Sequence, residues 1–588
     1  MNSSLTRNLA LISCLLSAVV SAATYQGTPT TFRALLPMLQ PGDTLELAAG
    51  TYPHFTVADR NGTATQWITI TGPTSGAPAI VQADLGPCCN TVEIRRSSYV
   101  AIRHLTVDNR GVRGAFAISA SSAPIHHIRI ENNRLVFTNA AQQDVGISTK
   151  VTTWGWEIRG NRIEQAGTGL YLGNSDGSLP FIDGVIERNL VVNTVGYNMQ
   201  IKHQNAWPAV AGLPTGRTRT FIRHNVFIKD GRASPDGDRP NLLVGGWPDT
   251  GPGADNGYEV YGNLLFQNPR EALFQATGNV SVHDNLFVKS SGPAALVMTN
   301  HSGKTMKRGY VYNNTFLTPG TAVSFSSAAS VDDLFAGNLL LAGTASTGTA
   351  TNTSNNLAVP FAMAGQTVRA PMMQLPGLDL YPLAGQAMGA PVDLTRVMND
   401  LATLVDFNGT AKGALRFRGA YAGDGANPGW PLDASLKDLA ASGGGAAGGG
   451  AAGGGAAGGG AAGGGAAGGG AAGGGATGGG AAGGGAAGGG AAGGAAAGGT
   501  AGGSDSLTPP SSGCGCQSTG HALALVVMVL PLLRWKTRRA TRPRGRVNSG
   551  ATIRCLTAAR AEFACQRRSS QPTRPPIATG PCRRDWLR

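Results

Sequence analysis

Cysteine is nearly absent from the part of this chain that can fold. Only 8 of 588 residues are Cys, and between the N-terminal apolar segment and residue 514 the sequence contains only the adjacent Cys88 and Cys89. A disulfide framework therefore does not hold the fold together. Cys88 and Cys89 form either a strained vicinal disulfide or two buried thiols.

Excess positive charge is also missing from the part that can fold. The formal net charge is +14, but residues 534–588 hold 15 Lys and Arg against 2 acidic residues and so account for +13 of it. The rest of the chain is nearly neutral. The sequence therefore does not support a basic surface for DNA or RNA, and we expect no nucleic-acid partner.

Apolar runs long enough to cross a membrane are absent as well. A membrane-spanning helix needs about 20 apolar residues, whereas residues 522–533 offer 12. Residues 1–22 combine one Arg, an apolar core at 9–20 and the small residues Ser21 and Ala22 at the exit. That order is typical of a secretory signal peptide, so we expect a secreted protein.

A strand followed by Asn recurs from residue 98 to residue 343. Each copy has an alternating apolar run before the Asn and an apolar pair after it, as in residues 128–137 and 221–228. Intervals of 22 to 38 residues separate the asparagines Asn133, Asn161, Asn189, Asn225, Asn263, Asn285, Asn314 and Asn338. Such an interval is typical of one solenoid coil, and the period-two alternation predicts strands.

The Asn column predicts a corner between two strands of each coil. Asparagine tolerates the left-handed backbone conformation of a sharp corner, and its amide can bond to the amide one coil above. Strands one coil apart run parallel, and parallel crossovers are right-handed. We therefore predict an all-β, right-handed parallel β-helix. A propeller or sandwich would need antiparallel hairpins, and the intervals contain no regular four-strand pattern.

The chain divides into seven parts by composition. A G-G-G-A-A repeat offers no side chain that can form a core, so it predicts a flexible linker. The parts are a signal peptide (1–22), an N-terminal cap with the first coils (23–97), the β-helix repeats (98–345), a C-terminal cap (346–441), the Gly/Ala-rich linker (442–511), a Cys, apolar and Arg segment (512–546) and a basic disordered tail (547–588).

Residues 30–39 have helical spacing, with Phe32, Leu35, Leu36 and Leu39 on one side and Thr available as N-cap. This pattern predicts a helix that caps the open end of the solenoid. A turn at 41–43 and a first strand at 44–47 follow.

Two segments carry a resemblance to a known family. Residues 40–53, Q-P-G-D-T-L-E-L-A-A-G-T-Y-P, with I-T-I-T-G at 68–72, resemble the opening of secreted β-helix proteins of the pectate-lyase-like superfamily, in particular the alginate lyase and chondroitinase B type. Residues 406–421 are similar to the closing segment of many such proteins. The resemblance implies a protein that acts on an acidic polysaccharide, with lyase chemistry. A non-catalytic carbohydrate-binding or adhesive protein, and a purely structural surface protein, stay open as alternatives.

Residues 512–546 resemble the MYXO-CTERM sorting signal, with a Gly-Cys pair, a short apolar segment and an Arg-rich end. The resemblance implies attachment to the outer membrane or cell envelope through Cys514 or Cys516, and so a cell-surface location. The alternative is a plain C-terminal anchor held by positive flanking charge.

Each Asn corner is followed by a strand whose alternate residues are expected to point outward and to stack at about 4.8 Å per coil. Two outward columns result, one with Ser148, Tyr171 and Gln200 and the next with Lys150, Gly173 and Lys202. The apolar residues expected to point inward are Val145, Ile147, Leu170, Leu172, Met199, Ile201, Leu242 and Val244. The small Gly173 would leave a gap between two lysines.

Cleavage of a uronic-acid chain by β-elimination needs a cation to neutralise the carboxylate, a base for the C5 proton and an acid for the leaving oxygen. A Lys can be the base only where burial or nearby positive charge lowers its pKa. Long intervals around residues 196–239 predict projecting loops, where binding sites usually form.

We expect Lys202 as the base, His203 as the proton donor and Arg223 and Arg239 as partners of the substrate carboxylate. The structural alternatives are a solvated lysine, a hydrogen-bonded surface histidine and two salt bridges. Further residues are expected to bind substrate, namely Asn198, Gln200, Tyr171, Lys150 and Trp247.

Calcium is the one candidate cofactor. Asp230, Asp236 and Asp238 offer the oxygen ligands that it prefers, although P-D-G-D is also an ordinary turn. The chain departs here from the family, because chondroitinase-B-type lyases place acidic calcium ligands shortly before the catalytic Lys, and residues 195–200 include none. We expect a monomer.

Overall fold

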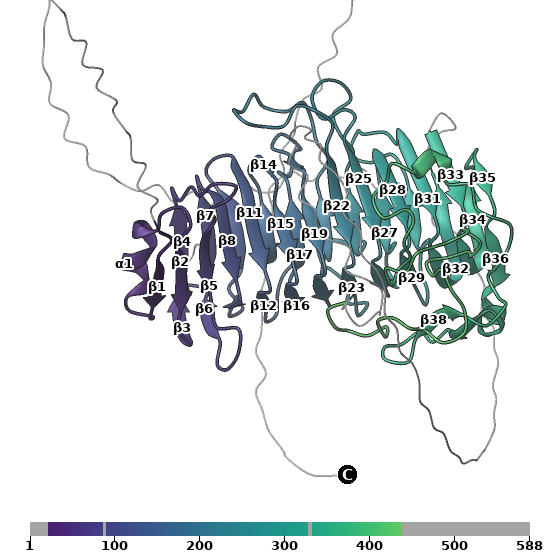
Figure 1. The fold of residues 1–588 in the computed structure, drawn as a ribbon, viewed down its shortest axis with the longest axis horizontal. Helices are drawn as coiled ribbons and strands as arrows, with labels where there is room; N and C mark the ends of the chain where they lie inside the picture. The colour runs from purple at the N-terminus through teal and green to yellow at the C-terminus, as the bar shows by residue number, and fades with distance from the viewer. Residues whose placement is uncertain (1–20, 86–89, 327–331, 438, 440–588) are drawn as a thin grey trace, which may run out of the picture. The chain divides into compact units, whose positions relative to one another are not determined.

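The computed structural model describes residues 21–85, 90–326, 332–437 and 439. Most of the predicted signal peptide, the Cys88–Cys89 pair, the linker, Cys514, Cys516 and the tail lie outside the described residues. The described part forms a parallel β-helix, as predicted, with strands stacked from α1 (Phe32–Leu35) at one end to β36 (Leu357–Pro360) at the other (Figure 1). Within the described ranges, no helix is long and apolar enough to cross a membrane.

The first sheet precedes the Asn corner in each coil. Its strands are β1 (Thr24–Gly27), β2 (Thr44–Leu47), β5 (Ile68–Thr71), β8 (Ser98–Arg103), β11 (Ile125–Glu131), β15 (Glu157–Arg159), β19 (Val185–Glu187), β22 (Arg219–Arg223), β25 (Gly257–Tyr261), β28 (Asn279–His283), β31 (Arg308–Tyr312), β33 (Asp332–Ala336) and β35 (Thr353–Ser354), with β14 (Thr153–Trp154) and β18 (Phe181–Ile182) paired beside β11.

The second sheet follows the Asn corner. It consists of β3 (Gly50–Pro53), β6 (Ala79–Gln82), β9 (Leu105–Asp108), β12 (Arg134–Val136), β16 (Arg162–Glu164), β20 (Leu190–Val192), β23 (Val226–Ile228), β26 (Leu264–Phe266), β29 (Leu286–Val288), the first parts of β32 (Thr315–Phe325) and β34 (Leu339–Gly348), and β36.

The third sheet completes each coil. It consists of β4 (Phe55–Ala58), β7 (Val92–Arg95), β10 (Ile118–Ser121), β13 (Val145–Thr149), β17 (Thr168–Leu172), β21 (Met199–Ile201), β24 (Leu242–Val244), β27 (Phe274–Ala276), β30 (Leu296–Met298) and the last parts of β32 and β34. Because β32 and β34 run through the second and third sheets, these two sheets are continuous there.

The interior is filled by the alternate apolar residues of all three sheets. In the third sheet the residues predicted to point inward are buried, among them Ile147, Leu170, Met199 and Leu242, each 0% exposed. Burying apolar surface is the main favourable term in folding, so this continuous column of side chains holds the coils together.

The Asn corner is confirmed, and one detail of its geometry is corrected. From Asn133 to Asn338, the side-chain amide of each ladder Asn donates to the amide oxygen of the next at 2.9 to 3.1 Å, and the ladder ends on Asn356. The left-handed residue is not the ladder Asn. It is the residue before it, such as Arg188 (φ 52°) or Gly262 (φ 66°). The ladder Asn is selected for its amide rather than for its backbone.

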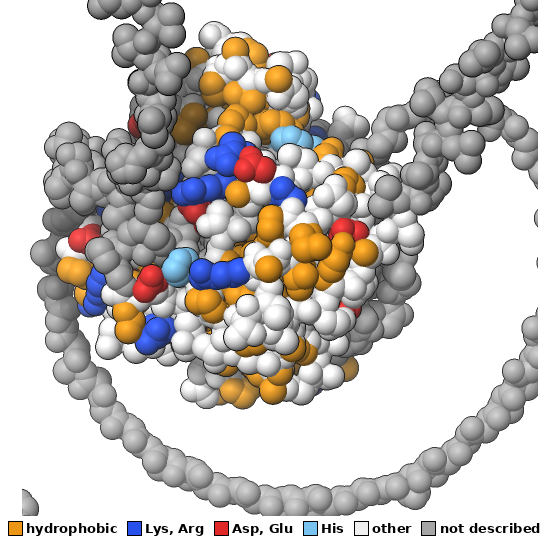
Figure 2. Space-filling view, turned by 90° about the vertical axis from the view of Figure 1, so that its left-hand side faces the viewer, with side chains coloured by type: hydrophobic (Ala, Val, Ile, Leu, Met, Phe, Trp, Pro, Cys, Tyr) orange, Lys and Arg blue, Asp and Glu red, His pale blue; other side chains and the backbone are white. Residues whose placement is uncertain are grey.

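The predicted N-terminal cap is present but short. Helix α1 is followed by the 3₁₀ turn η1 (Leu36–Met38), which contains Pro37. Phe32 and Leu39 are 1% exposed and cover the first coil. The predicted first strand, 44–47, is β2, while β1 lies before the helix and was not predicted. Seen from this end of the molecule, Lys and Arg side chains lie beside Asp and Glu side chains (Figure 2).

The C-terminal segment differs from the predicted cap, because it lies along the side of the β-helix. It contains η2 (Phe361–Gln366), the antiparallel pair β37 (Val368–Ala370) and β38 (Asp379–Pro382), and η3 (Thr395–Val397). Its apolar residues pack on the outward apolar side chains of the second sheet, for example Phe407 in the same cluster as Leu264. Lys412 then pairs with Asp284 at 2.8 Å, and the buried ammonium of Lys437 donates to the Gly262 carbonyl at 2.8 Å. The apolar pairs after each Asn therefore face two ways, one residue inward and one toward this segment.

Candidate functional site

The first predicted outward column exists on the third sheet. Ser148 pairs in register with Tyr171, and Tyr171 with Gln200. Ser148 and Gln200 are nevertheless buried, at 0% and 4% exposed, whereas Tyr171 is partly exposed. Of the three, Tyr171 is therefore the residue that a ligand can reach.

The second predicted column also exists and ends at the corner that leads back to the first sheet. Thr149 pairs with Leu172, and Leu172 with Ile201, so the next residues Lys150, Gly173 and Lys202 follow one another from coil to coil. A Cβ added at Gly173 would lie 3.5 Å from the Cβ of Lys202. Lys150 and Lys202 are two coils apart, about 10 Å, on one face.

Loops after the third sheet bring three more basic side chains to Lys202. The positive charges of Lys202, Lys304 and His301 all lower the pKa of His203. Lys304 also pairs with Asp249 at 3.0 Å, and His301 lies 3.5 Å from the Gln275 amide. We call Lys150, Lys202, His203, His301 and Lys304 the cationic cluster.

Two glycines allow this close approach. A Cβ on Gly245 would lie 2.2 Å from the backbone nitrogen of His203, and a Cβ on Gly246 would lie 2.4 Å from the Cβ of Lys304. Contacts that short do not occur between real atoms, so any larger residue would displace one coil from the next. The Gly-Gly pair after β24 therefore positions the cluster.

Protonation states at this face follow from burial and charge. Burial, then the charges of Lys202 and Lys304, lowers the pKa of His203, and its buried Nδ1 has no hydrogen-bond partner. Burial likewise lowers the pKa of Lys150, whose ammonium lies 5.4 Å from the Tyr171 ring centre. Burial raises the pKa of Tyr171. At neutral pH, His203 is thus a neutral imidazole and Tyr171 a protonated phenol.

One loop joins the two groups. The Tyr171 hydroxyl donates to Ser175 at 2.9 Å, and a Cβ on Gly177 would lie 2.7 Å from the His203 ring. Residues 173–180 therefore contact both the imidazole and the phenol. The face thus combines cations, a neutral imidazole and a phenol, which are the groups that β-elimination requires.

Arg223 does not lie on this face. It belongs to β22 of the first sheet, where its Nε contacts Glu187 at 2.5 Å and its Nη1 donates to the Tyr261 hydroxyl at 2.9 Å. Glu187 also pairs with Arg159. The expectation that Arg223 joins Lys202 is therefore corrected, since its guanidinium forms part of an ion-pair ladder along the first sheet.

Arg239 lies at the opposite edge of the third sheet from Lys202. It is in the loop before β24, with its guanidinium 5.9 Å from the Tyr197 ring centre and hydrogen-bonded to the carbonyls of Asp236 and Asp238. Arg239 flanks the same sheet but does not join the cationic cluster.

The three aspartates predicted for calcium do not converge. Asp230 pairs with Arg232 at 2.7 Å, while Asp238 accepts from the Ser234 amide and lies 3.5 Å from Arg270. Asp236 is exposed. Among the residues that the structure describes, no three His, Cys, Asp or Glu side chains are grouped to hold a metal ion. The calcium prediction is corrected because turn and salt-bridge contacts use the carboxylates of Asp230 and Asp238, and the exposed Asp236 does not converge with them.

Three predicted substrate-binding residues are interior. Gln200 is 4% exposed and lies within β21. Asn198 is 0% exposed, and its amide donates to the carbonyls of Val191 and Ile228 at a second corner. Trp247 is 2% exposed and stacks on Tyr258, with ring centres 4.5 Å apart. All three predictions are corrected, because these side chains are buried in the coils and a ligand on the surface does not reach them.

Lys304 and His301 were missed from the sequence. They lie about 100 residues after Lys202 and approach it because β30 is stacked three coils after β21. The only local signal is the interruption of the strand pattern by H-S-G-K at 301–304. Their approach depends on loop paths that no spacing rule describes.

Comparison with known proteins concerns the fold alone. No protein-family model and no curated protein matches the chain. An alginate lyase from Paenibacillus sp. str. FPU-7 is 16% identical over 57% of this chain and 99% of its own, with a TM-score of 0.31. A pectate lyase is 10% identical over 72% and 98%, with a TM-score of 0.38. The A-module of a mannuronan C-5 epimerase from Azotobacter vinelandii is 13% identical over 54% and 87%, with a TM-score of 0.29. These likenesses transfer no residue role to this chain.

Proposed function

We propose that the third sheet binds an acidic polysaccharide through the cationic cluster and cleaves it by β-elimination. The observation that carries the proposal is the Lys150, Gly173 and Lys202 column, with His203 and Lys304 beside it. Apart from this cluster, the folded part has almost no surplus charge. A local concentration of cations on a nearly neutral surface selects an anionic ligand.

The side chains divide the reaction between them. Lys202 neutralises the uronate carboxylate, which acidifies the proton at C5, while Lys304 is held beside it by the ion pair with Asp249. His203, kept neutral by burial and its cationic neighbours, accepts that proton. These roles differ from the ones expected from the sequence, where Lys202 was the base and His203 the proton donor. The C4–oxygen bond then breaks, a C4–C5 double bond forms, and Tyr171 protonates the leaving oxygen. Lys150, whose pKa burial lowers, holds the next carboxylate along the chain.

The test is the ultraviolet absorbance of unsaturated uronate ends formed from pectate, alginate and chondroitin. We expect one of the three to give product, and Lys202→Ala to lower kcat/KM by about 100-fold, because a charge-stabilising contact in a transition state is worth roughly 3 kcal/mol. The matched control is Arg134→Ala, which removes a 56% exposed cation from the second sheet. A fully active Lys202→Ala protein would reject the assignment.

Binding without cleavage is the outcome that separates the enzyme from a carbohydrate-binding surface protein. In that case Lys202→Ala would weaken retention on immobilised polysaccharide, while no unsaturated ends would form from any of the three polymers. That pair of results would reject the proposed chemistry and retain the proposed ligand.

We also propose that the protein acts outside the cell and attached to its surface. The signal-peptide pattern of residues 1–22 and the Cys, apolar and Arg order of residues 512–546 support this location. Fractionation of cells, with mass spectrometry of the C-terminal peptide, tests it. Recovery of the intact chain from the cytoplasm would contradict it.

A further inference from the structure

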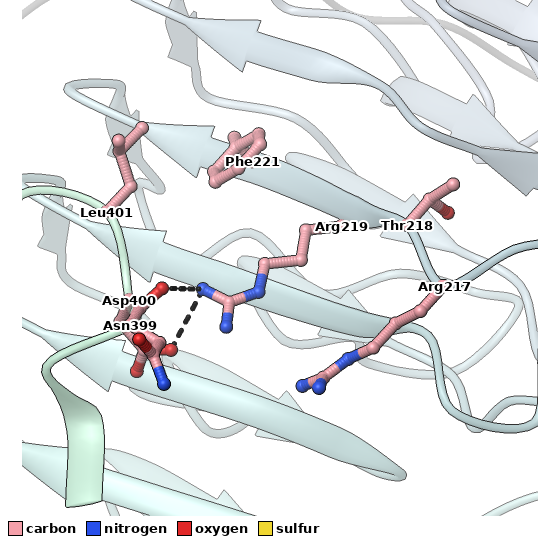
Figure 3. Close-up of a pocket in the computed structure, with 7 residues that line it drawn as sticks. All are labelled: Arg217, Thr218, Arg219, Phe221, Asn399, Asp400 and Leu401. Atoms are coloured by element: carbon pink, nitrogen blue, oxygen red, sulfur yellow. Dashed lines mark hydrogen bonds and ion pairs between the residues drawn. The ribbon is translucent and has the colours of Figure 1, made fainter. Parts of the chain in front are cut away.

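A cavity of about 420 Å³ lies on the outer side of the first sheet, on a different sheet from the cationic cluster. One wall is β22 with the residues before it, and the other is the C-terminal segment after η3. It is lined by Arg217, Thr218, Arg219, Phe221, Asn399, Asp400 and Leu401. Arg217 and Arg219 both extend toward the segment that carries Asn399 and Asp400 (Figure 3). This volume is within the range of small-ligand sites.

Positive charge in the cavity exceeds what its carboxylates neutralise. Arg219 is neutralised by two carboxylates, since its Nη1 lies 2.7 Å from Glu259 and 2.9 Å from Asp400, and the same nitrogen lies 3.0 Å from the Asn399 carbonyl. Arg217 is exposed and makes no hydrogen bond or ion pair with the described residues. A second guanidinium close by, Arg308, lacks a partner for its buried Nε.

Arg308 does not line the cavity but extends toward it over Gly257, which has no side chain. Arg219, Gly257, Asn279 and Arg308 follow one another along the first sheet, and a Cβ at Gly257 would lie 3.1 Å from Nη2 of Arg308. Burial, and then the charge of Arg217, lowers the pKa of Arg308. The guanidinium groups of Arg217 and Arg308 therefore repel each other. An anion bound between them would offset that repulsion.

One further feature matches a sugar rather than a bare anion. Phe221 and the 45% exposed Leu401 offer an apolar surface opposite the arginines.

We propose that this cavity binds a single sugar-acid unit, with its carboxylate on Arg217 and Arg308 and its apolar face on Phe221. The site does not depend on the proposed function, because its residues lie on another sheet. A terminal unit of a polymer and a free monosaccharide offer the same chemistry. Titrations with a free monosaccharide and with an oligouronate distinguish these two ligands.

The experiment is calorimetric titration of the full chain with D-glucuronate, D-galacturonate, D-glucose and sulfate, and with a reduced oligouronate. We expect a uronate to bind at least about 10-fold more tightly than glucose or sulfate, since a charge-assisted contact contributes about 1.5–3 kcal/mol. In the Lys202→Ala protein, which lacks the proposed third-sheet contact, Arg217→Ala should abolish that preference and Arg134→Ala should leave it intact. Binding of the free sugar and not of the oligomer identifies a monosaccharide site, and the reverse identifies a chain-end site.

Three results would overturn the proposal. They are the absence of uronate binding, equal binding of glucuronate and glucose or sulfate, and an unchanged affinity in Arg217→Ala. Because Arg217 is exposed, its replacement does not threaten folding, and thermal unfolding of the variant confirms that directly. Loss of uronate binding in Lys202→Ala but not in Arg217→Ala would place the ligand on the third sheet instead.

Discussion

Replacing Asn225 with Ala tests how the coils are held in register. Its side-chain oxygen accepts from the backbone amide and the side-chain amide of Asn189, at 3.0 and 2.9 Å. Its Nδ2 donates to the Ile186 carbonyl at 2.9 Å and to Asn263 at 3.0 Å. The substitution removes all four bonds from a site that is 0% exposed.

The expected loss of unfolding free energy is about 4 kcal/mol, because each hydrogen bond contributes about 1 kcal/mol net. The cost is not recovered from solvent, since the amide of Asn189 is left buried. Urea unfolding followed by circular dichroism measures it. The control is Asn205→Ala, which removes one bond from an exposed side chain to the Asp176 carbonyl and should cost below about 1 kcal/mol.

A loss below about 1 kcal/mol in Asn225→Ala, equal to that of the control, would refute the reasoning. The ladder would then be a consequence of coil stacking rather than a cause of it. An intermediate loss with a changed urea dependence would show that coils unfold separately, which solenoids permit.

Three further predictions concern the site and the C-terminal segment. Gly245→Ala forces a Cβ to 2.2 Å from the His203 nitrogen, so activity and melting temperature should both fall, whereas Gly216→Ala, with open space around it, should change neither. Cleavage should decline as pH falls through the lowered pKa of His203, below about pH 6.5, because the base becomes protonated; a flat acid limb would contradict the assignment. Burial lowers the pKa of His283, but Asp284 and Glu259 together outweigh burial and raise it above the ordinary value. Wild type should therefore exceed His283→Gln in stability below about pH 6.5 and lose that advantage as pH rises through the folded pKa.

The fold was readable from the sequence because each coil repeats one local rule. Alternation placed Ile147, Leu170 and Met199 inward and Tyr171 outward, and pairing in register then aligned Lys150 with Lys202. A period of two fixes the face of every strand residue, so these predictions needed no knowledge of the loops.

The other parts of the site depend on the loops that connect the strands and on the stacking of coils that are distant in sequence. Arg223 follows the same alternation, but it belongs to the first sheet, and sequence distance did not reveal that the corner separates it from Lys202. Asn198 and Trp247 are polar or aromatic residues at loop positions, where no period tells inside from outside. Lys304 joins the cluster only through tertiary stacking.

The path of the C-terminal segment was equally hidden. Residues 361–432 show no alternation that marks them as a segment packed along the side of the β-helix. The apolar residues that they bury on the second sheet cannot be told from interior residues by the sequence pattern. Parallel strands buried on both faces are near-continuous apolar runs, as in L-V-V at 190–192, and such runs do not identify what covers them.

The most direct test of the third-sheet site is a crystal structure of the protein with an uncleaved oligouronate. The account predicts a chain along the third sheet, with one carboxylate within about 4 Å of the Lys202 ammonium and the adjacent C5 facing His203. An oligosaccharide that contacts none of Lys150, Lys202 and Lys304, or that lies on the first sheet alone, would contradict it.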